Sequence, residues 1–304
     1  YKEFTFSEQI KFLRLIRNLK ADLVHFAMVH QPVLYFRPVV TTLQDFTTLR
    51  FYNPSKNYLI FKFKQLVYLF VNIVASIKSS QLITPSQFVK TDAVHFLKSN
   101  PKKITVTLES ADKISAPAEE FKPLKNIQFL MYVGRSLPHK NLERLMDAFK
   151  LLKQKHPDLK LVLVGKKDHL MERHLAYAEA HGIKDVEATG YVSEGQLKWL
   201  YENTACYCFP SLSEGFGLPS LEAMMHGAPV ASSNATCLPE VNEDAVHYFD
   251  PLNIVDMATK INEVLTDKKL RETLIKKGYI QVEKYSWKRM AEQTLEVYKK
   301  SLKS

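Results

Sequence analysis

Glycine is missing from a large part of this sequence. The first 133 residues contain none, and all nine glycines lie at or after Gly134. Glycine lets a backbone turn tightly and approach a ligand closely. A glycine-bearing phosphate loop is therefore excluded from the first part of the chain and is expected only in the second. The 304 residues are enough for two domains with separate cores.

Cysteine is also scarce. The three cysteines, Cys206, Cys208 and Cys237, have no second cluster of metal ligands to accompany them. Cys206 and Cys208 flank Tyr207 in an apolar run that is predicted to be a strand. We therefore expect both cysteine side chains to point to the strand face opposite the Tyr207 side chain. This pattern predicts buried, reduced thiols, which suit a cytoplasmic protein.

Acidic residues are few in the first part of the chain. Residues 1–125 hold 18 Lys and Arg against 9 Asp and Glu, and the remainder holds 24 against 23, for a net charge of +10. A basic surplus confined to one part favours an acidic partner, such as a phospholipid surface or a phosphorylated lipid acceptor. Nucleic acid is not expected, because no helix-turn-helix, zinc finger or aromatic-basic RNA-binding pattern occurs.

Long uninterrupted apolar runs are absent. The most apolar segment, residues 57–78, is a helix candidate rich in Phe, Tyr and Leu, but Lys64 and Asn72 break it into stretches too short to span a membrane. A basic, aromatic-rich helix of this kind suits a membrane surface. Its broad apolar face favours a helix packed in the domain core, which is the preferred interpretation.

Strand and helix patterns alternate along the chain, which predicts an α/β fold with parallel sheets. A polar, proline-containing passage that ends at Pro123 is the expected interdomain linker. We therefore expect one domain at 1–121, a second at 122–284 and a closing helix at 285–304. The spacing of Trp287, Ala291, Leu295 and Tyr298 predicts one face of that helix.

Two carboxylates stand out in residues 210–230. Glu214 follows an apolar strand, and Glu222, eight positions later, lies in a helix that starts at Leu218-Pro219. Open α/β sheets bind ligands beyond the carboxyl ends of their strands, and a helix N-terminus favours phosphate. Fixed carboxylates can accept hydrogen bonds from polyol hydroxyls. The competing interpretation is that each Glu merely complements the helix dipole.

Two cations form a second group. Arg135 and Lys140, five positions apart, follow a predicted strand and Gly134. Fixed cations of this kind can stabilise a negatively charged group of a ligand. His139, beside Lys140, is interpreted as a loop residue.

The stretch Glu214-Gly-Phe-Gly-Leu-Pro-Ser-Leu-Glu222 resembles the E-x7-E signature of retaining glycosyltransferases of family 4. The resemblance implies the GT-B architecture, with two Rossmann-like domains facing a cleft. Here the N-terminal domain is expected to be truncated, because the family's first strand and glycine-bearing loop have no counterpart. We expect either a fragment of a longer protein or a short form that covers its sheet edge as a homodimer.

The resemblance also implies roles for individual residues. Glu222 would hold the ribose, and Glu214 the donor sugar's hydroxyls. Arg135 and Lys140 would hold the diphosphate. The remaining donor-site residues are the backbone amides of Gly215, Phe216 and Gly217, together with Leu218 and, against the base, Val192. No Asp-x-Asp triplet occurs, so no metal and no cofactor besides the donor substrate are expected.

One residue departs from the family pattern. The family places a His before an Asp at the cleft, whereas here Gln44 precedes Asp45. A Gln side chain cannot titrate, but it can still donate a hydrogen bond to a sugar hydroxyl. The substitution allows binding to persist while turnover falls.

These features predict a retaining hexosyltransferase that acts on a glycan or lipid-linked acceptor, peripheral to the inner face of the membrane. GDP-mannose is the first choice of donor, because Ser232-Ser233-Asn234 and Leu238-Pro239-Glu240 are most similar to mannosyltransferases, and a UDP-hexose is the second. The alternative is a nucleotide-sugar-binding protein with little or no transferase activity. A glycosidase is disfavoured, because hydrolysis of a neutral glycoside has no diphosphate for two cations to stabilise.

Overall fold

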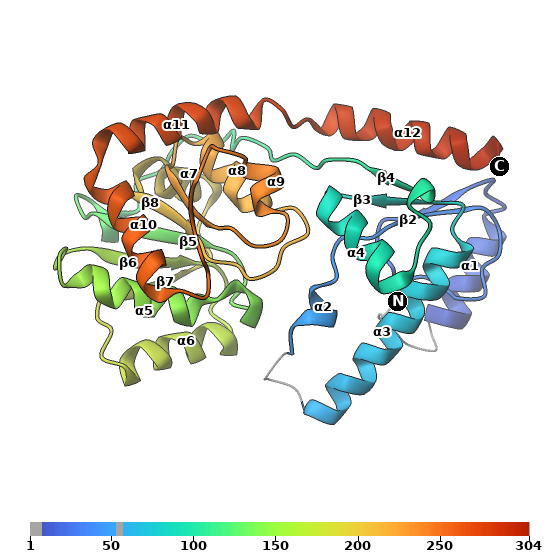
Figure 1. The fold of residues 1–304 in the computed structure, drawn as a ribbon, viewed down its shortest axis with the longest axis horizontal. Coiled ribbons are helices and arrows are strands. Elements are labelled where there is room, and N and C mark those ends of the chain that lie inside the picture. Colours follow the sequence, from blue (N-terminus) through green and yellow to red (C-terminus); the bar gives the residue numbers. More distant parts are fainter. Residues whose placement is uncertain (1–7, 53–56, 304) are drawn as a thin grey trace. The chain divides into compact units, whose positions relative to one another are not determined.

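The computed structural model describes residues 8–52 and 57–303. The chain forms two compact units, each described by itself. Unit 1 comprises Tyr1–Glu109 and Ser286–Ser304, and unit 2 comprises Ser110–Tyr285. Each unit is built on a parallel sheet with helices beside it (Figure 1). Two Rossmann-like α/β domains are therefore present, as predicted.

Unit 1 contains a four-stranded sheet in the order β1-β2-β3-β4, and all its neighbouring strands are parallel. Parallel neighbours need crossover connections, and α3 and α4 supply two of them. The elements of unit 1 are η1 (Glu8–Phe12), α1 (Leu13–Asn18), β1 (Val24–Phe26), β2 (Val39–Thr42), α2 (Thr47–Arg50), α3 (Tyr58–Lys78), β3 (Gln81–Thr84), α4 (Gln87–Leu97), η2 (Pro101–Lys103), β4 (Ile104–Val106) and α12 (Trp287–Lys303).

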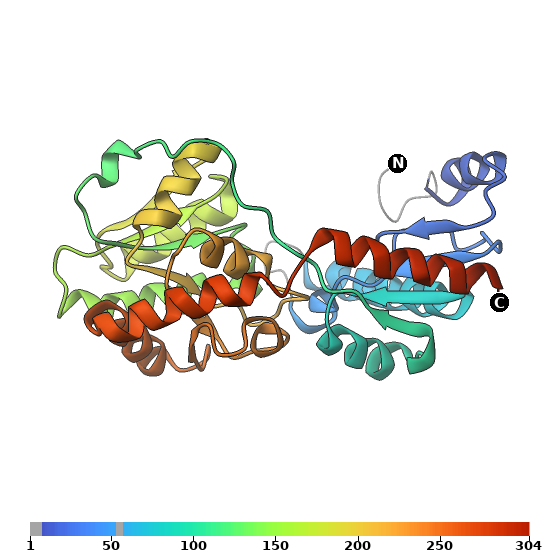
Figure 2. The ribbon, with the colours of Figure 1, turned by 90° about the horizontal axis from the view of Figure 1, so that it is seen from above.

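The last helix of the chain, α12, packs on the sheet of unit 1 (Figure 2). Val297 is buried there against Val40 of β2 and Ile83 of β3. The predicted face is only partly correct, because Trp287 is 40% exposed and Leu295 is 50% exposed. The C-terminal half of the helix makes the contact, through Val297, Tyr298 and Ser301.

Helix α3 contradicts the preferred interpretation of residues 57–78 as a core helix. It is continuous over 21 residues, and its buried residues are confined to one narrow side: Phe61, Val71, Asn72, Ala75 and Ser76. Its large apolar residues are mostly exposed, at 55 to 75% of their surface: Tyr58, Leu59, Ile60, Phe63, Leu66, Phe70 and Ile77. By length and composition alone it could also cross a membrane, contrary to the expectation that Lys64 and Asn72 leave apolar stretches too short to do so.

Unit 2 contains a six-stranded parallel sheet in the order β10-β9-β8-β5-β6-β7. Its elements are η3 (Lys122–Leu124), β5 (Phe129–Val133), η4 (Pro138–Lys140), α5 (Leu142–Lys153), β6 (Lys160–Val164), α6 (His169–Ala180), β7 (Val186–Gly190), α7 (Glu194–Asn203), β8 (Cys206–Phe209), α8 (Leu218–Met225), β9 (Val230–Ser233), α9 (Leu238–Asn242), β10 (His247–Phe249), α10 (Ile254–Thr266) and α11 (Lys268–Val282).

The core of unit 2 has two layers, one on each face of the sheet. Cys206 and Cys208 of β8 lie in the layer that contains α5 and α10, whereas Tyr207 lies in the layer that contains α8 and α9. This alternation is the one that a strand period of two predicts. All three cysteines are buried free thiols, as expected.

The boundary between the units lies at residue 110 rather than 122. The intervening segment is attached to unit 2 by hydrogen bonds. The Glu119 N–H donates to the Gly195 carbonyl at 3.0 Å, and the Ser193 hydroxyl donates to the Glu119 carboxylate at 2.8 Å. A polar, proline-containing composition marks a segment without regular structure, but it does not say which domain that segment packs on.

Candidate functional site

The strand order of unit 2 determines where its site lies. From β5 the chain proceeds outward through β6 and β7, and then returns to β8 on the other side of β5. The segments that follow β5 and β8 therefore leave the same end of the sheet at its topological switch point. We call residues 134–141 the β5 loop and residues 210–217 the β8 loop. The Leu212 N–H donates to the His139 carbonyl at 2.7 Å and joins the two loops.

Asn141 fixes the end of the β5 loop. It adopts a left-handed conformation, with φ of 61°, and its side chain is buried. Its amide donates to the Pro210 carbonyl at 3.1 Å and to the Pro251 carbonyl at 2.8 Å. One side chain thus ties together the loops that follow β5, β8 and β10.

The start of the β5 loop lies so close to Gly165 that this position has no room for a side chain. A Cβ added at Gly165, after β6, would lie 2.5 Å from the Gly134 carbonyl oxygen, and both glycines have positive φ. The two backbones approach each other at the sheet edge, and the Gly134 N–H donates to the Val164 carbonyl. Contacts between backbone atoms therefore fix the point where β5 ends and the β5 loop begins.

Lys140 and Glu214 meet where the two loops join. The Lys140 Nζ lies 2.6 Å from Glu214 Oε1, and the side chains are only 16% and 13% exposed. The sequence predicted both residues as donor ligands, but it did not predict that they contact each other. An ammonium group and a carboxylate at one point can bind an anionic diphosphate and the hydroxyls of an attached sugar.

Arg135 lies on the same loop, but its side chain is exposed. Its guanidinium contributes to holding the pKa of Asp168 below its usual value, after the hydrogen bonds from the Met171 and Leu170 N–H groups. Burial, followed by the charge of Lys140, lowers the pKa of His139 to about 4. His139 is therefore neutral at physiological pH.

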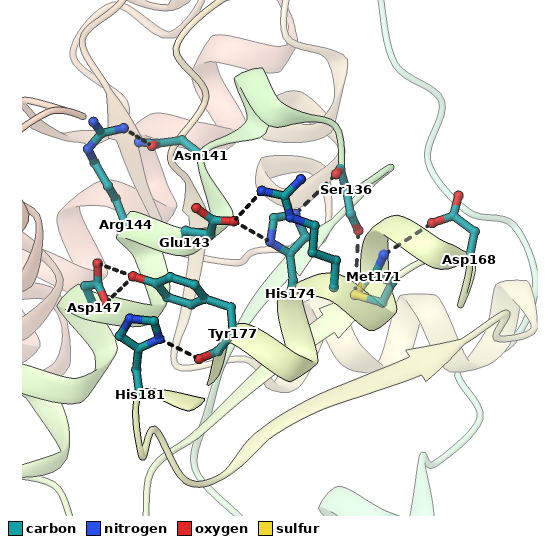
Figure 3. A network of polar contacts seen from close by, with 11 residues as sticks. Ser136, Asn141, Glu143, Arg144, Asp147, Asp168, Met171, His174, Tyr177 and His181 are labelled. Carbon is teal, nitrogen blue, oxygen red and sulfur yellow. Dashed lines mark hydrogen bonds and ion pairs between the residues drawn. The ribbon is translucent and has the colours of Figure 1, made fainter. Parts of the chain in front are cut away.

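Helix α6 supports the middle of the β5 loop (Figure 3). His174 Nε2 donates to the Ser136 carbonyl at 3.2 Å, and the Ser136 hydroxyl contacts the Met171 sulfur at 3.6 Å. His174 Nδ1 faces Glu143 of α5 at 3.9 Å. Burial dominates these effects and lowers the pKa of His174, so a neutral imidazole holds the loop next to Arg135.

Glu222 is held in place by Tyr201 and His226, two stacked rings that the sequence patterns did not predict. The Tyr201 hydroxyl donates to Glu222 Oε2 at 3.1 Å, and the Tyr201 ring stacks on His226 at 5.4 Å. His226 accepts from the Ile114 N–H through Nε2, so its Nδ1 carries the proton and donates to the Glu222 carbonyl. Burial and Glu222 both raise the pKa of Tyr201, which keeps it a donor.

The other predicted site residues fall in separate places. The Phe216 side chain is buried against Tyr285, so only its backbone is available to a ligand. Leu218 begins α8, and Val192 is half-buried in the turn after β7. Gln44 belongs to unit 1, where its amide donates to the Ala27 carbonyl at 3.4 Å, and its role beside a donor stays a prediction.

No group of three His, Cys, Asp or Glu side chains gathers as metal ligands within residues 8–52 and 57–303. The charges at the two loops of unit 2 are supplied by the protein's own Lys140, Glu214 and Arg135.

Comparison with known proteins identifies the family. A family model described as glycosyl transferases group 1 matches residues 113–281, which is more than half of the chain and lies within unit 2. The chain belongs to this family. The match includes both loops, Glu222 and the turn after β9. The alternative of a binding protein without transferase activity is not favoured by this membership.

Several curated glycosyl transferases are similar in sequence. O-antigen chain mannosyltransferase B of Escherichia coli is 32% identical over 237 residues, which cover 74% of this chain and 62% of that protein. The serotype-specific mannosyltransferase WbdA of the same organism is 35% identical over 202 residues, which cover 64% of this chain and 23% of that protein. The chain thus spans less than two thirds of these relatives.

Solved structures show the same fold. The sucrose-phosphate synthase of Thermosynechococcus elongatus matches 96% of this chain and 77% of its own, with a TM-score of 0.77 at 18% identity. Anabaena HepE, solved in complex with UDP and glucose, matches 98% of this chain and 84% of its own, with a TM-score of 0.76 at 19% identity.

Proposed function

We propose that this glycosyl transferase moves a hexose from a nucleotide diphosphate sugar to a hydroxyl of a glycan or lipid-linked acceptor. The observation that carries the proposal is the contact between Lys140 and Glu214 at the switch point of unit 2. This contact places a cation for the diphosphate beside an acceptor for sugar hydroxyls. Glu222, fixed by Tyr201 on the adjacent helix, is the ribose ligand.

The proposed reaction needs charge stabilisation more than proton transfer. The bond between the anomeric carbon and the diphosphate oxygen breaks, the acceptor oxygen forms the new bond, and its proton passes to the departing diphosphate. Lys140 and Arg135 offset the charge that develops on the diphosphate, so no metal is required. The E-x7-E signature supports retention of the anomeric configuration.

GDP-mannose is the proposed donor, because the similar O-antigen chain mannosyltransferase B and WbdA are both named as mannosyltransferases. A UDP-hexose is the second choice. It is supported by the fold shared with Anabaena HepE, which was solved with UDP and glucose.

Calorimetric titration with GDP, GDP-mannose, UDP and UDP-glucose tests the donor site. We expect binding to one base, with loss of that binding in Glu222→Ala. The matched control is Glu202→Ala, since Glu202 is exposed on α7 of the same unit. Binding of all four compounds with equal affinity, or binding unaffected by Glu222→Ala, would contradict the assigned donor site.

The acceptor side is proposed to meet an anionic lipid surface through α3. That helix carries Lys62, Lys64 and Lys78 and no acidic residue. Its exposed apolar residues include Phe63, Leu66 and Phe70. Lysines beside exposed aromatic and aliphatic side chains are typical of a helix that lies in a membrane interface. This arrangement supports a peripheral enzyme on the inner face of a membrane.

Sedimentation with vesicles tests this surface. We expect binding to vesicles that contain phosphatidylglycerol, weaker binding to pure phosphatidylcholine, and loss of both in Phe63→Ser/Leu66→Ser. The control is Leu252→Ser/Val255→Ser, which changes two residues of similar exposure in unit 2. A concentration-dependent dimer that the α3 variant abolishes, without vesicle binding, would show that a second copy of the chain covers α3 instead.

A further inference from the structure

The turn between β9 and α9 contains a strained residue, Thr236, that contacts the β8 loop. Thr236 has φ of +54°, in the left-handed region. A β-branched residue is disfavoured there, and such strain persists only where the surroundings impose it. The Thr236 side chain has a defined task in this conformation, because its Oγ1 accepts a hydrogen bond from the Glu214 N–H at 3.1 Å.

Cys237 and Leu238 contact the β8 loop between the Glu214 carbonyl and Gly217. The Cys237 thiol lies 3.3 Å from the Glu214 carbonyl and 3.2 Å from the Phe216 carbonyl, and donates toward both. Burial is the main cause that raises the pKa of this thiol, so it stays protonated as a donor. The Leu238 side chain closes against Gly217, where an added Cβ would lie 2.8 Å from Leu238 Cδ2.

We infer that Thr236, Cys237 and Leu238 form a clamp that positions the Glu214 carboxylate and the backbone amides after it for the donor sugar. Thr236 is the central positioning residue of this clamp, because it holds the N–H of Glu214 itself. The Lys140 ion pair constrains the other end of Glu214 at its carboxylate. The inference rests on the proposed function and adds residues that control how the hexose, rather than the nucleotide, is held.

The clamp makes a prediction that a merely structural turn does not make. Glu222 and the diphosphate-binding cations are not held by Thr236, so a change there should affect the nucleotide sugar and spare the nucleotide. Thr236→Val keeps the size and removes the hydroxyl. Thr236→Ser keeps the hydroxyl. Thr236→Gly removes the hydroxyl and also relieves the left-handed strain.

The experiment compares Kd for GDP-mannose with Kd for GDP by calorimetry, or UDP-glucose with UDP if the wild type prefers uridine. We expect Thr236→Val to raise Kd for the nucleotide sugar about fivefold, the effect of losing one hydrogen bond, and to leave Kd for the nucleotide unchanged. Thr236→Ser should behave as the wild type. Thr236→Gly should show the same selective loss while its Tm stays level or rises.

Asn126→Gly is the matched control, because Asn126 has φ of +60° in the same unit and is exposed. It should leave both Kd values unchanged. If the Thr236 variants do not fold, Cys237→Ala replaces them and should show the same selective loss. If Kd for the nucleotide sugar is the same in the wild type as in folded Thr236→Val, Thr236→Gly or Cys237→Ala, the clamp is overturned. A wild type that binds no nucleotide or nucleotide sugar would overturn the proposed function, and the clamp with it.

Discussion

Lys140 and Glu214 are 74 positions apart in the sequence, yet their side chains form an ion pair at 2.6 Å. The residue types and their places after strands suggested a ligand site, because loops at the carboxyl end of a parallel sheet are where ligands bind. The pairing itself depends on β5 and β8 being neighbours. The order of the strands in the sheet does not follow from local sequence patterns, so those patterns do not predict this contact.

Replacement of Lys140 should reduce catalysis strongly. Lys140→Met removes the cation that we propose for the departing diphosphate, and it removes the ion-pair partner of Glu214. We expect turnover of the nucleotide sugar to fall by more than about tenfold. Lys155→Met, an exposed lysine after α5, is the control for the loss of one positive charge. An unchanged rate in Lys140→Met would rule out the assignment of this lysine to the diphosphate.

The pKa of His139 makes a second prediction at this scale. Its pKa is about 4 in the folded chain, below the usual value of 6.5, so the unfolded state takes up a proton first as pH falls. The stability contributed by neutral His139 is therefore complete above about pH 6.5 and is lost progressively toward pH 4. Its upper limit is about 3 kcal/mol.

Chemical denaturation at pH 7, 5.5 and 4.5 measures this loss. His139→Gln cannot titrate, so its free energy of unfolding should decrease less with falling pH than that of the wild type. Burial also lowers the pKa values of His25 and His174, so the variant should still lose some stability. Identical pH profiles would show that His139 does not contribute.

At the scale of elements, helices were easier to locate than to orient. The spacing of Trp287, Ala291, Leu295 and Tyr298 correctly predicted a helix, but three of these four residues are exposed. An amphipathic pattern assigns residues to faces, whereas contact with a sheet begins only where the helix reaches it. The same limit applies to α3, whose apolar residues point largely to the surface.

The orientation of α12 can be measured with two substitutions on the same helix. Val297 is 3% exposed against β2 and β3, so Val297→Ala should lower the free energy of unfolding of unit 1 by roughly 1–3 kcal/mol. Leu295 is 50% exposed, and Leu295→Ala should change it by less than about 0.5 kcal/mol. A larger cost at Leu295 than at Val297 would reverse the assigned face.

At the scale of the whole molecule, the two units have separate cores and separate sheets. Lys140, Glu214, Glu222 and the clamp all come from unit 2. Unit 2 is also one continuous segment of the chain, whereas unit 1 is completed by α12 from the other end.

Residues 110–285 expressed alone should therefore fold and bind the nucleotide that the full chain binds. Circular dichroism and calorimetry measure these two properties. A segment that begins at residue 122 should be less stable, because it lacks the contacts of Ile114 and Glu119 with unit 2. A folded 110–285 segment that does not bind nucleotide would show that unit 1 supplies part of the donor site.

The sequence by itself determined the fold class, and it predicted which residues form a donor site. These follow from local patterns: alternation of strands and helices, glycines after strands, and Glu214 and Glu222 on either side of a helix start. Only the tertiary structure decided which of these groups meet. The ion pair of Lys140, the support of Glu222 by Tyr201 and the clamp at Thr236 join segments that are distant in sequence. Such contacts depend on strand order and helix packing, which are properties of the whole chain.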